Sequence, residues 1–271
     1  RIRLRREFAL LYSRTGRPAE AAALLEQNAN AEYSYWDLCR AADIWAAAGN
    51  AQAAAVYLAR WRKLATPAEG DWCVHQSVVS RLLGRRWAAK RWLRHGCMHD
   101  SECARRLAAL LCAEGHYKAA LRLQNLIKRS EPENELILAE LATFYWWAGN
   151  EKQAHILARQ GLQYLEKHRH TMNTALYLTR AAQLYIAMQE LGEAESALTQ
   201  AERAPLCARC IYGGCKDALL MRILLLERSG NYSKALALAA KGAAQYPDEE
   251  DFSYALKRIP CIYVKKRKNK A

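Results

Sequence analysis

A short phrase that recurs along the chain constrains the fold more than any other feature of the sequence. In each copy a glycine follows a helical stretch and an alanine stands five positions later, first as Gly16 with Ala21. The phrase returns every 31 to 35 residues at Gly49, Gly84, Gly115 and Gly149, and again after a longer interval at Gly230. A fixed period of this length is the signature of a protein built from stacked repeats.

One further copy fits between Gly149 and Gly230, but only if Gln189 stands where the glycine is expected. Ala194 is then the alanine of this copy. The alternative anchor, Gly192, fits the flanking residues less well. The sequence therefore favours Gln189 as the anchor and about seven repeats in all.

The spacing predicts that each copy is a pair of antiparallel helices, each of about 13 residues, joined by a tight turn. The anchor glycine tolerates left-handed backbone at the end of the first helix. A small residue seven positions before the anchor and the alanine after it let the two helices approach closely. One pair cannot bury its own apolar face, so the pairs stack. The small residues are Ala9, Ala42, Ser77, Ala108, Ala142 and Ala182, and Ile223 breaks the series.

The pattern of small residue, aromatic, glycine, alanine and proline resembles the tetratricopeptide repeat, most typically over residues 110–120 and 141–154. The resemblance covers nearly the whole chain. It implies an all-α, right-handed superhelical solenoid of antiparallel helix pairs, and an irregular α-solenoid of another type is the alternative. We expect pairs over 2–28, 33–64, 69–95, 101–129, 134–167, 173–203 and 216–245. We expect one solenoid over 1–250, followed by a C-terminal segment, 251–271, with a basic tail.

Composition supports helices and excludes several classes of protein. Apolar residues make up 52% of the chain, whereas it has only 13 glycines and 6 prolines, which argues against disorder and against an all-β fold. Lys and Arg number 41 against 27 Asp and Glu, a formal charge of +14, which bears on partners and not on fold. No apolar run reaches the roughly 18 residues that a membrane span needs. Thr66 to Glu69 reads as a capping box that opens the third pair.

The nine cysteines cannot all pair within one chain because their number is odd. Several fall on apolar helix faces, where a thiol acts as a small hydrophobe, and this slightly favours a cytoplasmic over a periplasmic location. Three lie in one loop, Cys207, Cys210 and Cys215, and are candidates for a disulfide, with plain thiols as the alternative. This loop has one Cys-x2-Cys knuckle and no fourth ligand nearby, so no metal site is predicted.

The segment from His95 to Cys103 also contains metal-ligand residue types, with Cys97 and His99 between them. Their spacing matches no standard zinc finger. We interpret the segment as the turn between two repeats, with Asp100 or Ser101 capping the next helix.

The resemblance implies that the first helix of each pair lines a concave groove where a partner binds. Trp and Arg are the usual anchors of protein interfaces, and the Trp146–Trp147 pair is the strongest candidate, although at least one of the two is expected to pack into the solenoid. The Lys and Asn positions that clamp a chaperone tail in some members hold Arg6, Leu10, Cys39 and Asp43 here, so that clamp is not preserved. The predicted partner-binding residues are Arg6, Trp36, Arg81, Arg105, Thr143, Trp146, Trp147 and Gln183.

Basic residues cluster at both chain ends, including the tail 265–270, and on the helix over 84–95. That helix carries five Lys and Arg side chains beside two tryptophans, which suits either a solvated face or an anionic partner. The basic clusters are separated along the chain, which weakens the case for a continuous nucleic-acid stripe.

We find no Gly-rich phosphate loop, nucleophile elbow or His-Glu-x-x-His motif, so no catalytic residue, cofactor or metal is predicted. The leading hypothesis is a non-enzymatic scaffold that binds a peptide or protein partner in the groove. The first alternative is a periplasmic segment of a bacterial envelope or exopolysaccharide export assembly. The second alternative is binding of nucleic acid or another polyanion by the basic faces.

Overall fold

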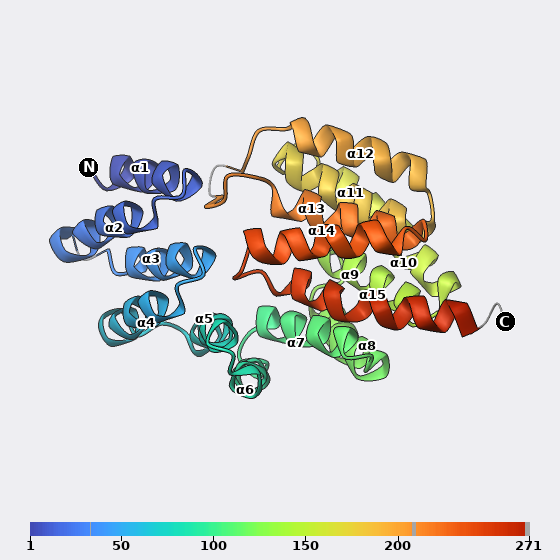
Figure 1. The fold of residues 1–271 in the computed structure, drawn as a ribbon, viewed down its shortest axis with the longest axis horizontal. Coiled ribbons are helices and arrows are strands. Elements are labelled where there is room, and N and C mark those ends of the chain that lie inside the picture. The colour runs from blue at the N-terminus through green and yellow to red at the C-terminus, as the bar shows by residue number, and fades with distance from the viewer. Residues whose placement is uncertain (33, 208–209, 269–271) are drawn as a thin grey trace. The chain divides into compact units, whose positions relative to one another are not determined.

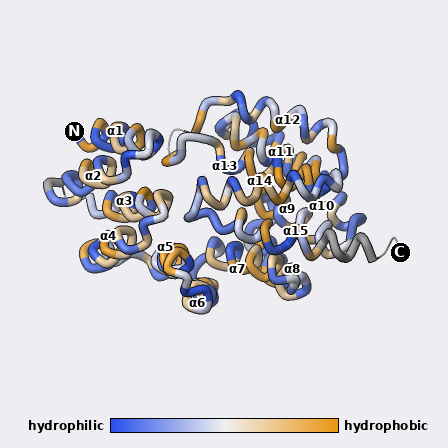
Figure 2. Tube along the Cα trace, in the orientation of Figure 1, coloured by the Kyte–Doolittle hydropathy of each residue, from blue (hydrophilic) through white to orange (hydrophobic). Residues whose placement is uncertain are grey.

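The protein is described by a computed structural model, which places the backbone of residues 1–32, 34–207 and 210–268. Within these residues the only regular secondary structure is α-helix (Figure 1). Apolar and polar positions alternate along the helices, as amphipathic packing requires (Figure 2). The helices are α1 (Ile2–Arg14), α2 (Pro18–Glu32), α3 (Trp36–Ala47), α4 (Ala51–Ala65), α5 (Glu69–Leu82), α6 (Arg86–Gly96), α7 (Ser101–Ala113), α8 (Tyr117–Ser130), α9 (Glu135–Trp147), α10 (Glu151–Lys167), α11 (Thr174–Met188), α12 (Leu191–Arg203), α13 (Lys216–Arg228), α14 (Tyr232–Gln245) and α15 (Glu250–Lys268). The prediction of seven helix pairs is confirmed.

The chain divides into two compact units. Unit 1 contains residues 1–106 together with two short segments, 208–214 and 244–250. Unit 2 contains residues 107–207, 215–243 and 251–271. The helix α15 begins at Glu250, one residue before the predicted start of the C-terminal segment, and the side chains of the basic tail 265–270 lie outside the described residues. None of the described helices has both the length and the apolarity that a bilayer span requires.

The backbone confirms the anchor of every repeat. Each of the six predicted glycines has a φ between 75° and 84°, in the left-handed region. Gln189 has a φ of 66° at the end of α11, so it occupies the same position without the freedom of glycine. Gly192 lies inside α12, which excludes it as the anchor. The choice of Gln189 is therefore confirmed.

Replacing Gln189 with glycine is expected to stabilise unit 2 by about 1 kcal/mol, because left-handed backbone costs a residue with a Cβ more than it costs glycine. Gly149→Ala is the matched control at an anchor with a φ of 84°, and it is expected to destabilise the same unit by a similar amount. Urea denaturation of both variants checks the prediction. Equal stabilities for the wild-type protein and Gln189→Gly would contradict it.

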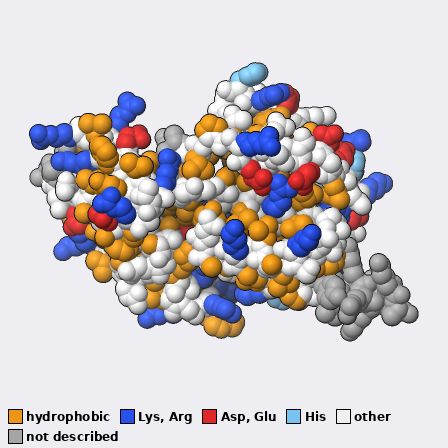
Figure 3. Space-filling model, turned by 45° about the horizontal axis from the view of Figure 1, so that its top comes forward, with side chains coloured by type: hydrophobic (Ala, Val, Ile, Leu, Met, Phe, Trp, Pro, Cys, Tyr) orange, Lys and Arg blue, Asp and Glu red, His pale blue; other side chains and the backbone are white. Residues whose placement is uncertain are grey.

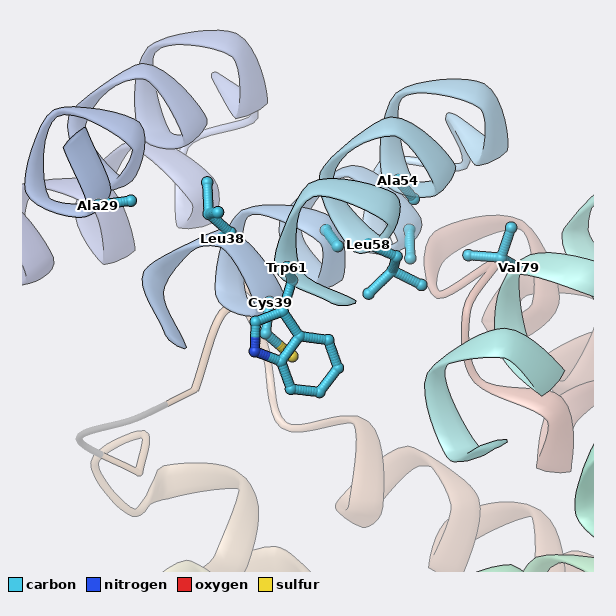
Figure 4. Close-up of a cluster of buried hydrophobic side chains, with 9 residues drawn as sticks. Ala29, Leu38, Cys39, Ala54, Leu58, Trp61 and Val79 are labelled. Carbon is cyan, nitrogen blue, oxygen red and sulfur yellow. The ribbon is translucent and has the colours of Figure 1, made fainter. Parts of the chain in front are cut away.

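Small residues at the predicted positions form the contacts between paired helices. The alanine that follows each anchor is at most 9% exposed in all seven copies. The small residues of the first helices are buried as well, and Ile223 is accommodated in the seventh pair at 1% exposure. In unit 1 the largest buried side chain is Trp61 of α4, which lies beside Cys39 in a core formed with α3 (Figure 4).

The helix caps differ in part from the prediction. The capping box at Thr66 is wrong, because Thr66 ends α4 with a φ of 43° and Ala68 is the N-cap of α5 with no side-chain bond. This leaves the Glu69 carboxylate available for other contacts. Asp100 caps α7 as predicted, since its Oδ1 accepts a hydrogen bond from the backbone N–H of Glu102 at 2.9 Å.

Candidate partner-binding site

Arg6 stabilises the junction between the first two pairs of unit 1. Its Nε donates to Asp37 Oδ1 at 2.8 Å and its Nη2 to Ser34 Oγ at 2.8 Å. Asp37 is fully buried and its second oxygen accepts from Asn28 Nδ2 at 2.9 Å. Arg6 therefore neutralises a buried carboxylate, while 35% of its side chain remains exposed.

Trp36 presents an apolar surface at the start of α3. The residue is 55% exposed, and its ring centroid lies 5.2 Å from that of the buried Trp61. Trp87 of α6 is the other tryptophan among the large exposed apolar residues, at 83%. Large aromatic rings that remain exposed are frequent anchors of protein interfaces.

Arg81, near the end of α5, binds a segment of the same chain. Its Nη1 donates to the carbonyl of Pro247 at 2.9 Å and its Nη2 to the carbonyl of Asp248. Its Nε also lies 3.8 Å from the Glu250 carboxylate. The guanidinium thus holds the segment 244–250 mainly through the main chain.

The segment 210–214 is held against α1 in a similar way. Arg14 Nε donates to the carbonyl of Cys210, and Ser13 Oγ donates to the carbonyl of Ile211, both at 2.8 Å. The two segments contact each other, since the Tyr212 and Tyr246 rings meet edge to face at 5.1 Å. Two irregular segments therefore occupy the C-terminal ends of the first helices of unit 1.

Arg105 of α7 pairs within its own helix. Its Nε and Nη2 each donate to the Glu102 carboxylate at 2.8 Å. Arg106 Nε donates to the same carboxylate at 2.7 Å. Burial opposes ionisation of Glu102, but the bonds and charges of the two arginines outweigh it and lower its pKa to about 2. The charge of Arg105 is thus largely offset inside unit 1.

Two of the predicted partner-binding residues lie inside unit 2 and not on its surface. Thr143 is 2% exposed and its hydroxyl donates to the carbonyl of Ala139 at 2.9 Å. Gln183 is 6% exposed and its Nε2 donates to Thr143 Oγ1 at 3.2 Å. The two side chains satisfy each other between α9 and α11, so neither is presented to a partner.

Trp146 and Trp147 are both partly buried, so the expectation that at least one packs into the solenoid is met. The guanidinium of Arg228 lies 4.7 Å from the centroid of the Trp146 ring. That of Arg258 lies 3.9 Å from Trp147, which also stacks on Phe144 at 5.8 Å. The rings are held by cation–π contacts from α13 and α15, which the sequence did not indicate.

A Cys–His–Asp arrangement in unit 1 was not predicted. Cys39 Sγ lies 3.2 Å from His75 Nε2, and His75 Nδ1 lies 3.0 Å from Asp43 Oδ1. Burial raises the pKa of the Cys39 thiol far above its ordinary value, and the Asp43 charge adds to this effect. A buried thiol that stays protonated is a poor nucleophile, so the geometry alone does not make a catalytic site.

The loop cysteines are present as thiols, and no disulfide joins the cysteines in the described part of the chain. Cys207 Sγ lies 3.4 Å from Asn173 Oδ1, and Cys210 Sγ lies 3.7 Å from the carbonyl of Tyr212. The predicted crosslink among Cys207, Cys210 and Cys215 is therefore not formed in this structure.

A basic groove along α8 was also not predicted. Lys118 and Arg122 lie one turn apart on this helix, and the lining contains no acidic side chain among the described residues. In the space-filling view of Figure 3, basic side chains lie at scattered places among apolar and uncharged ones. The residues that line the groove are Lys118, Leu121, Arg122, Asn125, Leu126, Lys128, Arg129 and Tyr145.

No protein-family model and no curated protein matches the sequence. The structure is similar to a tetratricopeptide repeat protein from Parabacteroides merdae, with 13% identity, a TM-score of 0.50, and coverage of 95% of this chain and 98% of that chain. It is also similar to human IFIT1, solved as a dimer with m7Gppp-AAAA, with 12% identity, a TM-score of 0.51, and coverage of 96% and 63%. The all-α solenoid of tetratricopeptide-like helix pairs is thereby confirmed as the fold.

Proposed function

We propose that this chain, a solenoid with the tetratricopeptide fold, is a non-enzymatic scaffold that binds a peptide or protein on the first-helix face of unit 1, formed by α1, α3 and α5. The observation that carries the proposal is the pair of bonds from Arg14 and Arg81 to main-chain carbonyls. An arginine that donates to main-chain carbonyls does not depend on the side chains of the segment that it holds, so it can accept segments of many sequences. The face already holds two such segments of its own chain.

Trp36 provides the contact for an external partner on the same face. It lies at the beginning of α3, whereas Arg14 and Arg81 lie in the last turns of α1 and α5. Its 55% exposure leaves apolar surface that a partner would remove from water. The partly exposed guanidinium of Arg6 bonds to Ser34, two residues before Trp36, and adds polar surface beside the indole.

Trp36→Ala is expected to weaken peptide binding at least about tenfold, as loss of an interface anchor does. Peptides selected from a random displayed library on the wild-type protein supply the ligands, and fluorescence anisotropy measures their Kd. Trp87→Ala, which removes an exposed indole from the second helix of a pair, is the matched control and should leave Kd within about twofold. Equal losses of peptide affinity in the two variants, or no loss of affinity with Trp36→Ala, would contradict the proposal.

The α8 groove favours a second candidate function, the binding of a polyanion. Its lining combines Lys118, Arg122, Lys128 and Arg129 with apolar side chains. Single-stranded RNA and an acidic polysaccharide are the two ligands to compare, because both offer repeated negative charge. Binding to the wild-type protein that falls steeply between 50 and 200 mM salt would support this function. A smaller fall over the same range in a Lys118→Ala/Arg122→Ala variant would support it as well. Peptide binding by the first-helix face of unit 1 should persist over the same change in salt.

A further inference from the structure

Three helix ends converge in unit 1, and two glycines permit the approach. A Cβ on Gly96, the last residue of α6, would lie 2.3 Å from Cys103 Sγ and 2.8 Å from Cys73 Cβ. A Cβ on Gly70, near the start of α5, would lie 2.3 Å from Asp100 Cβ. The start of α5, the end of α6 and the start of α7 therefore meet with no room for a larger residue.

This junction gathers three different metal-binding groups from α5 and α6. Glu69 Oε1 lies 3.4 Å from His95 Nε2 and 3.8 Å from Cys73 Sγ. The three donor atoms all lie within 4.8 Å of one another. Glu69 and Cys73 are one turn apart on α5, so both side chains lie on the same face of the helix. Carboxylate, thiolate and imidazole are the donor set that zinc accepts.

The separations match the edges of a tetrahedral coordination sphere. Zinc binds oxygen and nitrogen at about 2.0–2.1 Å and sulfur at about 2.3 Å, so two ligands of a tetrahedral ion are about 3.3–3.7 Å apart. The two measured edges, 3.4 and 3.8 Å, are close to this range. Two of the three donor pairs are thus already spaced as in a tetrahedral site, and the third pair lies within 4.8 Å.

A neighbouring arginine orients the Glu69 carboxylate so that it can act as a ligand. Arg62 Nη2 donates to Glu69 Oε2 at 3.1 Å, which fixes the carboxylate and leaves Oε1 directed at the other two donors. A bound cation would favour the thiolate form of Cys73, because coordinated thiols are deprotonated.

The Cys39–His75–Asp43 cluster of the same unit provides a contrast. There Cys39 and Asp43 contact opposite nitrogens of the His75 ring, at 3.2 and 3.0 Å. The lone pairs of these two nitrogens point away from each other, so one ion cannot replace both contacts. Both clusters combine a thiol, an imidazole and a carboxylate, but only in the cluster at Glu69 does one carboxylate oxygen contact both of the other donors.

We propose that Glu69, Cys73 and His95 bind one divalent zinc-type metal ion, with the fourth position facing solvent. The exposure of the His95 side chain, 57%, provides the entry path and the room for a water ligand. Cys97 and His99 follow His95 closely in sequence, and the His99 ring lies 5.5 Å from the His95 ring. Three protein ligands and one open position are an arrangement that zinc proteins use.

Titration of the reduced, untagged, chelator-treated full chain with Co²⁺ and Zn²⁺ tests the proposal. We expect one equivalent to bind, a thiolate-to-cobalt charge-transfer band, and a zinc Kd of about 1 µM or tighter by competition with a chromophoric chelator. His95→Ala, Glu69→Gln and Cys73→Ser should each weaken binding by about 100-fold or more, since even outer-shell changes cost 10- to 100-fold. Cys73→Ser should also remove the charge-transfer band.

His75→Ala is the matched control, because it removes the histidine of the other cluster, and it should leave the zinc Kd within about threefold. The His95 side chain is exposed, so His95→Ala is expected to fold even if the fully buried Cys73 does not tolerate serine. Circular dichroism verifies the fold of each variant. Absence of stoichiometric binding by the wild-type chain, or a larger loss in His75→Ala than in His95→Ala, would overturn the assignment.

Discussion

Replacing Arg258 with methionine is expected to destabilise unit 2 by about 3–5 kcal/mol, because it leaves a buried carboxylate without its partner. Arg258 and Glu227 are 6% and 1% exposed. Arg258 Nη2 lies 2.8 Å from Glu227 Oε2, and Nε lies 3.1 Å from Oε1, which is a bidentate pair. Denaturation by guanidinium chloride, followed by circular dichroism, measures the loss.

The double variant Glu227→Met/Arg258→Met separates the cost of an unpaired charge from the cost of a lost contact. It should recover most of the stability, since apolar replacement of a buried ion pair is often close to neutral. What remains lost reports the stacking of Arg258 on Trp147 at 3.9 Å. A double variant as unstable as Arg258→Met would show that the unpaired carboxylate is not the cause.

Asp37→Ala is expected to destabilise unit 1 by about 3 kcal/mol, the second largest effect. The Asp37 carboxylate is fully buried and accepts from Arg6 and Asn28. Asn28 in turn accepts from Arg5 Nη1 at 3.1 Å. The substitution therefore breaks the polar network through which α3 contacts α1 and α2. Thermal and urea unfolding of the variant measure the change.

Glu20→Ala is the matched control for Asp37→Ala. Glu20 also pairs with an arginine of unit 1, Arg17, at 2.9 Å, but both side chains are about half exposed. Exposed pairs contribute little, so the unfolding curves of this variant should be nearly the same as those of the wild-type protein. Similar losses of stability in the two variants would mean that burial does not determine how much the Asp37 network contributes to the stability of unit 1.

The repeat could be predicted from the sequence because its geometry depends on neighbouring residues. A left-handed turn residue and a small residue at each close approach leave a local pattern at every copy. This is why Gln189 could be identified as an anchor even though it is not glycine. The helix bounds follow from the same periodicity.

The candidate site could be predicted only in part, because exposure depends on contacts distant in sequence. Arg81 was predicted to meet a partner, and it binds Pro247, 166 residues away, in the same chain. Thr143 and Gln183 were placed in the groove by repeat position, yet they pair with each other in the interior. The convergence of Glu69 and Cys73 with His95 was missed because a turn of non-standard spacing gave no finger pattern.

The return of residues 208–214 and 244–250 to unit 1 has a kinetic consequence. Most repeat solenoids contain only contacts between neighbouring repeats, so their folding depends little on distant parts of the chain. Here Ser13 bonds to Ile211 across 198 residues. On the ribosome the first three helix pairs emerge before Ile211 and Pro247, which Ser13 and Arg81 bind, so unit 1 lacks both contacts until these residues have been synthesised. During that interval the first-helix face of unit 1 is open to other polypeptides.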